Sequence, residues 1–413
     1  MASGARRRLP FAPELAQRVA AWFPGHMAAA SREMARRSFK VDAVIEVRDA
    51  RLPFTTAPML VDNRGKMGSG AQWSSKPWVL VFNKADLANI NMRRRLEALY
   101  GLAPSRFGDG VAPRFGDGWS AHDEPTATML QTVEVERQRR PPAAVLFTSA
   151  FDDAAVHRLA SVLATVAPPR FKTVGSTCLV CGVPNVGKSS LINALRTNYL
   201  AGSRTMDGRG EEQQRGGAIS EDAARASRRR KRRRGRVAKV GALPGVTRQL
   251  SMIQVAEAPS VFIVDSPGVM SPRQIAPGDV ETALRLVLVR AVDDSSLDDA
   301  PLILAHYALW MLNSEKSGRG ASGRPGSARD AAREPKALRY VDEFKLDGPT
   351  DDLATLLRGI AKTRKMQLRP GSEEDELRCA SLFVKMIRKG ELGRLTIDDI
   401  PRTARGGAGA GGA

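Results

Sequence analysis

Short runs of apolar residues that end in polar turns recur along the chain and predict the strands of an α/β fold. Four of these runs cover residues 78–82, 144–147, 176–181 and 261–264, and a fifth, with acidic residues among the apolar ones, covers 41–47. Continuous apolar runs of about four to eight residues are typical of strands buried on both faces of a parallel sheet. The pattern therefore predicts a doubly wound, mostly parallel sheet, and such sheets bind ligands beyond the carboxyl ends of their strands.

Two C-terminal segments, residues 353–360 and 377–387, carry apolar residues at helical spacing and predict helices whose apolar stripes form a core. The basic residues between these stripes would cover the outer face and suit contacts with phosphates. They are Arg358, Lys362, Arg364, Lys365, Lys385, Arg388, Lys389 and Arg394. The sequence thus predicts a small helical domain with a basic surface behind the α/β domain.

The turn after strand 176–181 fits the phosphate-loop template G-x-x-x-x-G-K-[ST] at every fixed position, and an amphipathic helix follows it, as the motif requires. Glycines in such loops turn backbone N–H groups toward phosphate oxygens, and the helix N-terminus adds a favourable dipole. Lys188 would reach the β- and γ-phosphates, and Ser189 would bind Mg²⁺. The residues expected to bind the nucleotide here are Asn185, Val186, Gly187, Lys188, Ser189 and Ser190. The alternative is a glycine-rich turn without a ligand.

Polar turns after two other predicted strands suit recognition of a guanine base. Asn83, Lys84 and Asp86 follow strand 78–82 as N-K-x-D, and Ser149 and Ala150 follow strand 144–147. The Asp86 carboxylate can accept hydrogen bonds from N1–H and the N2 amine of guanine, whereas adenine has an acceptor at N1 and no N2 amine. Lys84 would cover one face of the base, and a backbone N–H near Ser149 would reach O6. N-K-x-D alone also fits a polar helix cap, but together with a phosphate loop it predicts GTP and GDP as ligands.

The remaining phosphate-binding pieces follow the loop, whereas the base-recognition pieces precede it. In P-G-V-T at 244–247, Thr247 is expected to meet Mg²⁺ and the γ-phosphate. In D-S-P-G at 265–268, Asp265 is expected to hold a water on Mg²⁺, and the Gly268 N–H to sense the γ-phosphate. This order differs from the common GTPase arrangement, and a parallel sheet tolerates such a circular permutation because each strand keeps its place in space.

Composition narrows the class of partner. The chain has 413 residues, enough for two or three domains, and a net charge of +20, which favours RNA over a membrane as a polyanionic partner. Its longest apolar stretch, 301–312, is interrupted by a histidine and is too short to cross a bilayer. Three cysteines exclude a disulfide framework. Cys178 and Cys181 form a C-x-x-C without a second pair, so buried strand cysteines are expected rather than a zinc site.

Two arginine-rich segments leave alternatives open. The N-terminal segment is rich in arginine and contains no acid before Glu14, which fits a mitochondrial presequence or a plain basic arm. Residues 228–236 are basic at every position except Gly235, and they fit an RNA-gripping finger, a nuclear localisation signal or a solvated loop. On the first of these interpretations, Arg228, Arg230 and Arg233 contact RNA.

The joint pattern resembles the circularly permuted GTPases that assist assembly of the large ribosomal subunit, in particular the bacterial YlqF/RbgA type and its mitochondrial ribosome-associated counterpart. The match includes W-F-P-G-H-M at 22–27, D-A-R-L-P at 49–53, the four motifs above and a C-terminal segment that ends at 387–396. The resemblance implies a GTPase that is weak alone and stimulated on a maturing large subunit. It also implies a K⁺ ion beside Asn185 and ribosomal RNA contacts by Lys385, Arg388, Lys389 and Arg394.

Val269 stands where a Ras-like GTPase places the glutamine that orients the attacking water. Because valine has no polar group, the resemblance suggests His26 for this task, and a histidine that caps a helix or faces ribosomal RNA is the alternative. We therefore expect His26, Thr247 and Gly268 to be the catalytic residues. A scaffold that binds GTP without hydrolysing it is the rival from another class of function.

The resemblance further implies ribosomal proteins and other assembly factors as partners, and a monomer without a membrane span. It places the chain in the mitochondrial matrix, free or associated with the inner membrane, with the nucleolus or cytoplasm as alternatives. The expected domains are a basic arm or presequence (1–20), a permuted GTPase domain (21–312, with insertions near 101–124 and 196–235), a flexible linker (313–336), a helical RNA-binding domain (337–402) and a disordered tail (403–413).

Overall fold

The computed structural model describes residues 11, 14–21, 41–58, 76–100, 125–139, 141–167, 175–207, 251–257, 260–270, 274–313 and 339–401. Five predicted site residues lie outside this part of the chain: His26, Arg228, Arg230, Arg233 and Thr247. Most of the predicted N-terminal arm, the insertion 101–124, nearly all of the linker and the tail also lie outside it. Of the predicted insertion 196–235, residues 196–207 continue the helix that follows the phosphate loop, and the rest lies outside the described residues. All other predicted site residues are described.

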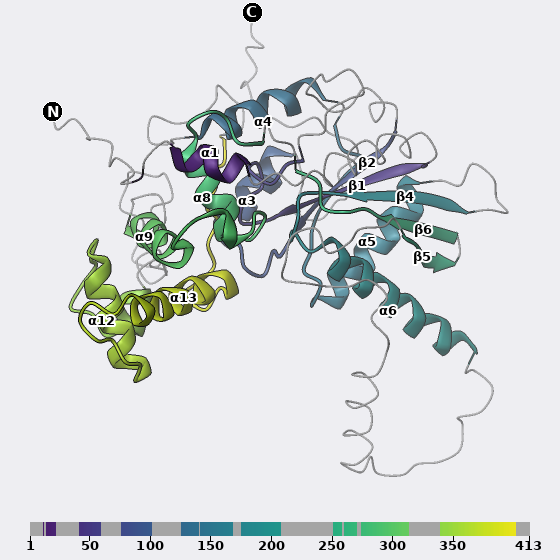
Figure 1. Ribbon diagram of the computed structural model, residues 1–413. Coiled ribbons are helices and arrows are strands. Elements are labelled where there is room, and N and C mark those ends of the chain that lie inside the picture. Colours follow the sequence, from purple (N-terminus) through teal and green to yellow (C-terminus); the bar gives the residue numbers. More distant parts are fainter. Residues whose placement is uncertain are drawn as a thin grey trace, which may run out of the picture.

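A six-stranded sheet with the order β3-β2-β1-β4-β6-β5 forms the centre of the molecule (Figure 1). Its strands are β1 (Ala43–Asp49), β2 (Trp78–Asn83), β3 (Ala144–Phe147), β4 (Ser176–Cys181), β5 (Ser251–Glu257) and β6 (Ser260–Asp265). All neighbouring strands run parallel except β5, which pairs antiparallel with β6. The prediction of an α/β fold with a mostly parallel sheet is therefore confirmed, and β5 is a strand that the apolar pattern did not indicate.

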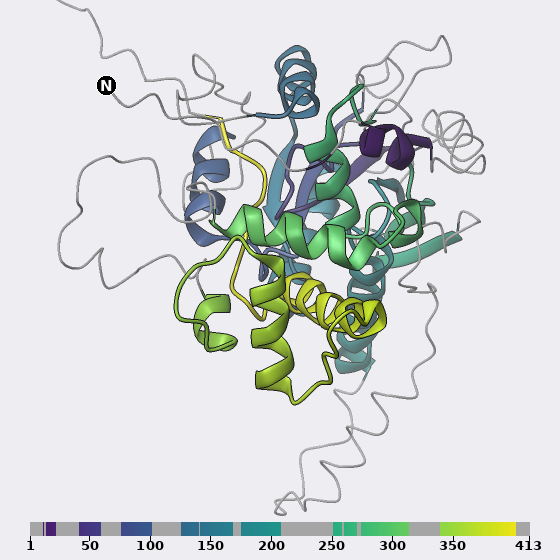
Figure 2. The same ribbon diagram turned by 60° about the vertical axis from the view of Figure 1, so that its left-hand side comes forward.

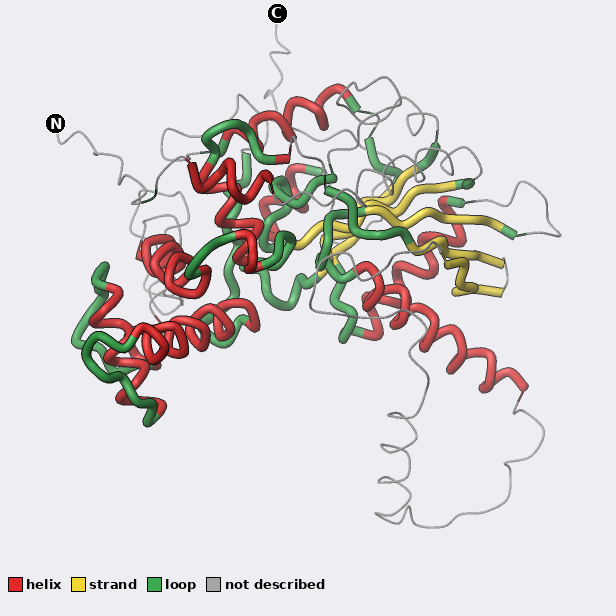
Figure 3. Tube along the Cα trace, in the orientation of Figure 1, coloured by secondary structure: helices red, strands yellow, loops and turns green. Residues whose placement is uncertain are grey.

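Helices cover both faces of this sheet (Figure 3). Among the described residues before 300, the α-helices are α1 (Glu14–Ala21), α3 (Ile90–Leu99), α4 (Ala127–Gln138), α5 (Asp153–Val166), α6 (Lys188–Asp207) and α8 (Val280–Leu288). The helices α5 and α6 contact the strands on one face, and buried residues of α3 and α4 join the core on the other face. Two cores thus sandwich the sheet, as expected for a doubly wound arrangement.

The two faces of β1 differ in chemistry. Its alternate residues Ala43, Ile45 and Val47 belong to the apolar core under α5 and α6. On the opposite face, Glu46 and Arg48 are each only 1% exposed. Charged side chains are almost never buried to this degree unless they are paired, so the strand requires partners on its neighbours.

The helix α4 and the residue that follows it supply these partners. The Arg48 guanidinium donates to Glu46 Oε1 (2.7 Å from Nε) and forms an ion pair with Glu136. Arg139 completes the cluster, because its Nη1 lies 2.7 Å from Glu46 Oε2 and its guanidinium stacks 3.7 Å over the ring of Trp78. The charges therefore compensate one another inside the sheet–helix layer, and this cluster fixes α4 on the sheet.

The C-terminal helices pack beside the α/β domain against α9 (Ala300–Asn313), as the two orientations of Figures 1 and 2 show. They are α11 (Arg339–Glu343), α12 (Leu353–Arg364) and α13 (Glu373–Lys389). The rings of Tyr340 and Phe344 contact Phe383 edge-on. The predicted apolar stripes are largely buried, and they belong to a cluster that is continuous with the core of the α/β domain. The apolar stretch 301–312 lies within α9, a largely buried helix. Among the residues that the structure describes, no helix is long and apolar enough to cross a membrane.

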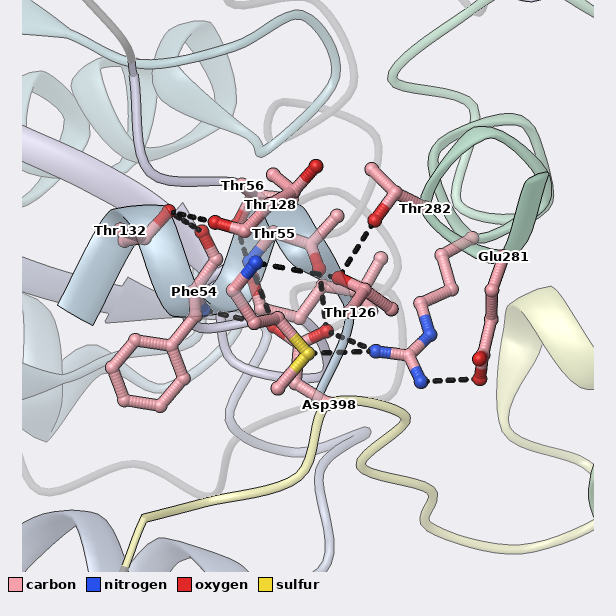
Figure 4. A network of polar contacts seen from close by, with 12 residues as sticks. Phe54, Thr55, Thr56, Thr126, Thr128, Thr132, Glu281, Thr282 and Asp398 are labelled. Atoms are coloured by element: carbon pink, nitrogen blue, oxygen red, sulfur yellow. Dashed lines mark hydrogen bonds and ion pairs between the residues drawn. The ribbon is translucent and has the colours of Figure 1, made fainter. Parts of the chain in front are cut away.

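After α13 the chain returns to the α/β domain along α3 (Figure 2). The backbone N–H of Leu395 donates to Leu87 O at 3.0 Å, and that of Ile397 donates to Arg51 O at 2.8 Å. Asp398, which is buried, accepts from the backbone N–H groups of Phe54 and Thr55, both at 2.8 Å (Figure 4). This return segment, residues 395–400, therefore attaches the helical part to loops that follow β1 and β2.

The buried Asp398 also pairs with an arginine of α8. Arg285 Nη1 lies 3.1 Å from Asp398 Oδ1, while its Nη2 lies 2.5 Å from Glu281 Oε1. Burial raises the pKa of Asp398, and the charge of Arg285 and the bonds from Thr55 oppose that shift. Both carboxylates of the network shown in Figure 4 thus share one guanidinium.

Candidate nucleotide-binding site

The predicted phosphate loop joins β4 to α6, and α6 begins at Lys188. Asn185 and Gly187 have φ angles of 58° and 95°, in the left-handed region that favours glycine. A Cβ atom on Gly187 would lie 2.3 Å from Asn83 Nδ2, so only glycine fits there. The loop therefore has the tight, strained backbone that lets N–H groups and the N-terminus of α6 converge on an anion.

Lys188 folds back over this loop. Its Nζ donates to the carbonyl oxygens of Gly182 and Val183, each at 2.9 Å. Burial lowers the pKa of Lys188 to about 8, and the negative charge of Asp265 opposes the shift. A phosphate in the loop would raise the pKa of Lys188 again, because a neighbouring anion stabilises the charged form of an ammonium.

Ser189 and Asp265 meet at the start of α6, as predicted for a magnesium site. The Ser189 hydroxyl donates to Asp265 Oδ2 at 3.3 Å. The other oxygen, Oδ1, is buried without a hydrogen-bond partner, and burial raises the pKa of Asp265 although Lys188 opposes that shift. A hydrated divalent cation would satisfy this oxygen and favour the ionised carboxylate. Mg²⁺ at phosphate sites takes one or two such ligands and completes its shell with phosphate oxygens and water, so the residues present fit this ion.

The N-K-x-D turn is bonded directly to the phosphate loop, about one hundred residues away in the chain. Asn83 Nδ2 donates to Val186 O at 2.8 Å, and Lys84 Nζ donates to Asn185 O at 2.6 Å. The Thr148 hydroxyl, just before the S-A turn, donates to Asn83 Oδ1 at 3.2 Å. The structure therefore brings the three turns that the sequence assigned to the nucleotide to one edge of the sheet.

The residues assigned to the edge of the base lie on adjoining turns. Ala85 N donates to Thr148 O at 3.0 Å, which holds the N-K-x-D turn beside the S-A turn. Asp86 is exposed, whereas Ser149 is buried and Ala150 is half-buried. The exposed Asp86 carboxylate can accept hydrogen bonds, and backbone N–H groups at residues 149 and 150 can donate them. This combination suits a planar ligand whose edge carries both donors and an acceptor.

The D-S-P-G turn lies against the other side of the phosphate loop. A Cβ atom on Gly268 would lie 2.6 Å from Pro184 Cα, so a larger residue would displace the loop. Val269 donates its N–H to Gly182 O at 3.2 Å and is buried. The position after D-S-P-G therefore carries an apolar side chain inside the core, and the orientation of water by another group stays a prediction. The Asn185 amide donates to Arg290 O at 2.7 Å, and its predicted K⁺ contact stays a prediction.

The residues predicted to contact RNA divide into two groups. Lys385, Lys389 and Arg394 are exposed, as expected. Arg388 differs from the expectation of an outward-facing side chain. Its guanidinium donates to the carbonyls of Val287 and Leu288 and pairs with Asp294 (2.6 Å), so it joins α13 to α8. Helical spacing alone could not separate it from its exposed neighbours, because the neighbouring α8 decides which side is covered.

The D-A-R-L-P turn at 49–53 contains two charged residues, Asp49 and Arg51, to which the sequence alone assigns no role. Asp49 lies 3.0 Å from Lys84 Nζ and 2.8 Å from Arg51 Nη2. Asp49 and Arg51 are both buried. The signal that could have found them is the position of an aspartate and an arginine directly after a buried strand, at the same edge as the other motifs. The cysteines Cys178 and Cys181 are free and buried, as predicted.

Comparisons with known proteins extend over most of the chain, although no family model matches it. Mitochondrial ribosome-associated GTPase 1 of Xenopus tropicalis is 28% identical over 397 residues, which cover 92% of this chain and 94% of that protein. Ribosome biogenesis GTPase A of Bacillus cereus is 24% identical, with coverage of 92% and 94%. A solved GDP-bound structure of YlqF aligns with a TM-score of 0.41 and 15% identity over 87% of this chain and 95% of that one, and this likeness is too low to add to the sequence comparison. The sequence comparison confirms the resemblance carried by the motifs: the chain is a homologue of the YlqF/RbgA-type ribosome biogenesis GTPases and the mitochondrial ribosome-associated GTPases.

Proposed function

We propose that this protein is a GTP-binding and GTP-hydrolysing assembly factor for the large subunit of the mitochondrial ribosome, built on a circularly permuted phosphate-loop GTPase domain. The observation that carries the nucleotide part is the direct bonding of Asn83 and Lys84 to the carbonyls of the phosphate loop. It joins a base-recognition turn to a phosphate-binding turn in one site. The reversed order of the two motifs in the chain does not prevent this, because the parallel strands β2 and β4 both flank β1 and end at the same edge.

Each part of the site has a separate task in this proposal. The loop N–H groups and Lys188 bind the phosphates. Ser189 and Asp265 would hold Mg²⁺, which would supply positive charge against the negative charge of the reacting phosphates. The Gly268 N–H is expected to sense the γ-phosphate, together with Thr247. Because Val269 is buried and apolar, the attacking water is oriented by His26 or by a group of the ribosome. Hydrolysis by the free protein is accordingly weak.

Guanine recognition rests on Asp86. The carboxylate accepts from N1–H and the N2 amine, so replacement of Asp86 by asparagine presents a donor to the same edge and favours xanthine nucleotides. We expect wild-type protein to bind GDP at least about a hundredfold more tightly than ADP, and Asp86→Asn to prefer XDP over GDP. Competition binding with a fluorescent GDP analogue measures both ratios, and Glu97→Gln on α3 is a control outside the site. Equal competition by ADP and GDP would contradict the guanine assignment.

The ribosomal part of the proposal rests on the homologues, which are named for ribosome association or ribosome biogenesis. The exposed Lys385, Lys389 and Arg394 supply positive charge on the helical part, and the net charge of +20 suits a nucleic-acid partner. The mitochondrial assignment follows the name of the Xenopus relative and the arginine-rich N-terminal segment. Imaging of a tagged full-length chain tests it, and a nucleolar signal would point instead to the arginine run as a nuclear address.

A non-hydrolysing scaffold is the alternative that Val269 favours, because no polar side chain at this position can orient water. Single-turnover hydrolysis with and without large subunits separates the two functions. Stimulation by the subunit supports the GTPase, and an absence of turnover under both conditions supports the scaffold.

A further inference from the structure

The carboxylate of Asp49 lies at the centre of contacts that join three loops of the nucleotide site. Asp49 is the last residue of β1 and pairs in register with Asn83, the last residue of β2. Its backbone successor, Ala50, donates its N–H to Asn83 O at 2.8 Å, so the ends of both strands are held together. The side chain of Asp49 is 1% exposed and therefore cannot reach a ligand in solvent by itself.

Both carboxylate oxygens of Asp49 are occupied. Oδ1 accepts from the Arg51 N–H and from Arg51 Nε, each at 3.0 Å. Oδ2 accepts from Arg51 Nη2 at 2.8 Å and from Lys84 Nζ at 3.0 Å. Burial by itself would raise the pKa of Asp49, but the charges of Arg51 and Lys84 and these bonds hold it below its ordinary value. The carboxylate is thus ionised and fixed in orientation.

Lys84 connects this carboxylate to the phosphate loop. Its Nζ donates to Asp49 Oδ2 and to Asn185 O, so one ammonium bridges the end of β1 and the loop. Burial lowers the pKa of Lys84, and the Asp49 charge opposes this shift, whereas the nearby Arg51 reinforces it and Asp86 weakly opposes it. Lys84 also has a φ of 58°, a conformation that costs a non-glycine residue energy and needs support from its surroundings.

We propose that Asp49 is a positioning residue of the guanine-nucleotide site: it acts through Lys84, whose ammonium it holds against the Asn185 carbonyl so that the base turn and the phosphate loop are fixed relative to each other before the nucleotide arrives. This inference rests on the proposed nucleotide-binding function. Pre-organisation of this kind strengthens binding because the ordering of the two loops is no longer part of the cost of association.

Asp49 is itself fixed from the side of the C-terminal helices. Arg51 Nη1 donates to Arg388 O at 3.2 Å, and Arg51 O accepts from the N–H of Ile397 at 2.8 Å. The arginine that shares the Asp49 carboxylate is therefore anchored at both its backbone and its side chain. The carboxylate can orient Lys84 because its other partner is held by a separate part of the molecule.

A double-mutant cycle measures whether Asp49 acts through Lys84. GDP affinity is determined for the full-length wild type, Asp49→Asn, Lys84→Met and the double variant by calorimetry. Loss of a charge-assisted hydrogen bond weakens binding by about tenfold, so we expect this factor for Asp49→Asn in the wild-type background. In the Lys84→Met background the same substitution should change the affinity by less than about twofold, because the group that Asp49 positions is absent.

Two further variants keep the outcome interpretable. Glu46→Gln removes an equally buried, arginine-paired carboxylate three positions earlier on β1, and it should leave GDP affinity unchanged even where it lowers stability. If Asp49→Asn yields too little folded protein, Asp49→Glu keeps the charge and displaces the carboxylate by one methylene. It should weaken GDP binding severalfold alone and not when combined with Lys84→Met.

The outcomes separate this inference from the function on which it rests. Absence of GDP binding by the wild type would overturn the proposed function. Two other outcomes would overturn the positioning role. In one, Asp49→Asn weakens GDP binding equally with Lys84 present and with Lys84→Met, and in the other it does not weaken GDP binding at all. The network would then be a purely structural ion-pair cluster.

Discussion

Two strands of the same sheet end in a buried aspartate, and the two carboxylates are in opposite states. Asp49, at the end of β1, has partners for both oxygens, and its pKa lies below the ordinary value because Arg51 and Lys84 outweigh its burial. Asp265, at the end of β6, has one oxygen without a partner, and burial raises its pKa against the opposing charge of Lys188. Both residues are about 1% exposed, so burial alone does not account for the difference.

In the proposed function, the difference distinguishes Asp49, a carboxylate that completes the fold, from Asp265, a carboxylate that would bind a ligand. A buried polar group without a partner costs free energy, and proteins retain such groups mainly where a ligand or ion supplies the missing contact. A fully paired buried carboxylate is instead part of the protein's own structure. We therefore expect Asp265 to matter for chemistry more than for stability, and Asp49 to matter for stability and for the arrangement of the loops.

The largest expected effect is on hydrolysis and concerns Asp265. Asp265→Asn removes the charge that stabilises a divalent cation, and GTP hydrolysis on large subunits should fall by about 10²–10³-fold, the usual loss when one electrostatic contact to the transition state is removed. Single-turnover assays with saturating GTP measure this rate. Glu46→Gln is the matched control, since it changes a buried carboxylate of the same sheet away from the site. A variant that hydrolyses GTP at the full stimulated rate would exclude Asp265 from the mechanism.

The next effect is on the stability of the nucleotide-free protein. Substitution of the two aspartates should change the free energy of unfolding in opposite directions. Asp49→Asn leaves Arg51 buried without its partner and should lower the free energy of unfolding by about 3 kcal/mol. Asp265→Asn removes a carboxylate that is poorly solvated when ionised and should raise it by about 1 kcal/mol. Urea unfolding at pH 7 in the presence of EDTA measures both values. Two changes of equal sign would contradict the comparison.

The pH dependence of stability should follow from the same pKa shifts. A raised pKa in the folded state favours folding when the group is protonated, so the advantage of Asp265→Asn over the wild type should shrink as pH falls from 7 toward the pKa of Asp265. The pKa of Asp49 is lowered in the folded state, so its ionised form favours folding. The stabilisation from Asp49 is present above the ordinary aspartate pKa and is lost only as pH falls below it.

A smaller effect concerns Lys188 and the pH dependence of binding. Burial lowers its pKa to about 8 in the nucleotide-free protein, while a bound phosphate would raise it. GDP affinity should therefore be level below pH 8 and fall by up to about tenfold per pH unit above it. Titration calorimetry between pH 7 and 9.5 measures this slope. Lys188→Met should bind GDP weakly and without a decline over this range, and an equal slope in both proteins would assign the titration to another group.

The smallest expected effect separates two neighbouring basic residues of α13. Lys385→Ala should reduce the salt dependence of large-subunit binding by about one unit of slope, as for one lost phosphate contact, and leave unfolding unchanged. Arg388→Ala should leave that slope unchanged and lower stability, because its guanidinium bonds the carbonyls of Val287 and Leu288 and pairs with Asp294. Sedimentation at several salt concentrations and urea unfolding give the two readings.

The sheet and its edge could be predicted from the sequence because their signals are local. The runs that became β2, β3, β4 and β6 are largely buried on both faces and therefore lack a polar face, whereas β1 buries a charged pair, Glu46 and Arg48, on one of its faces. β5 was not predicted, since it is the antiparallel edge strand and its sequence S-M-I-Q-V-A-E has a polar residue at every third position instead of a continuous apolar run. The phosphate loop and the N-K-x-D turn were predicted to share a ligand because parallel strands place their carboxyl ends together.

By itself, the sequence determined five of the six strands and the meeting of the phosphate loop with the N-K-x-D turn at one edge of the sheet, because those properties depend on neighbouring residues and on the ends of strands. Only the tertiary structure decided which charged side chains are paired and which are left without a partner. It paired Asp49 with Lys84, left one oxygen of Asp265 unpartnered, and turned Arg388 inward toward α8. The physical reason is that the free energy of a buried charge is set by the groups that surround it in space, and these come from segments as far apart in the chain as Arg51 and Arg388.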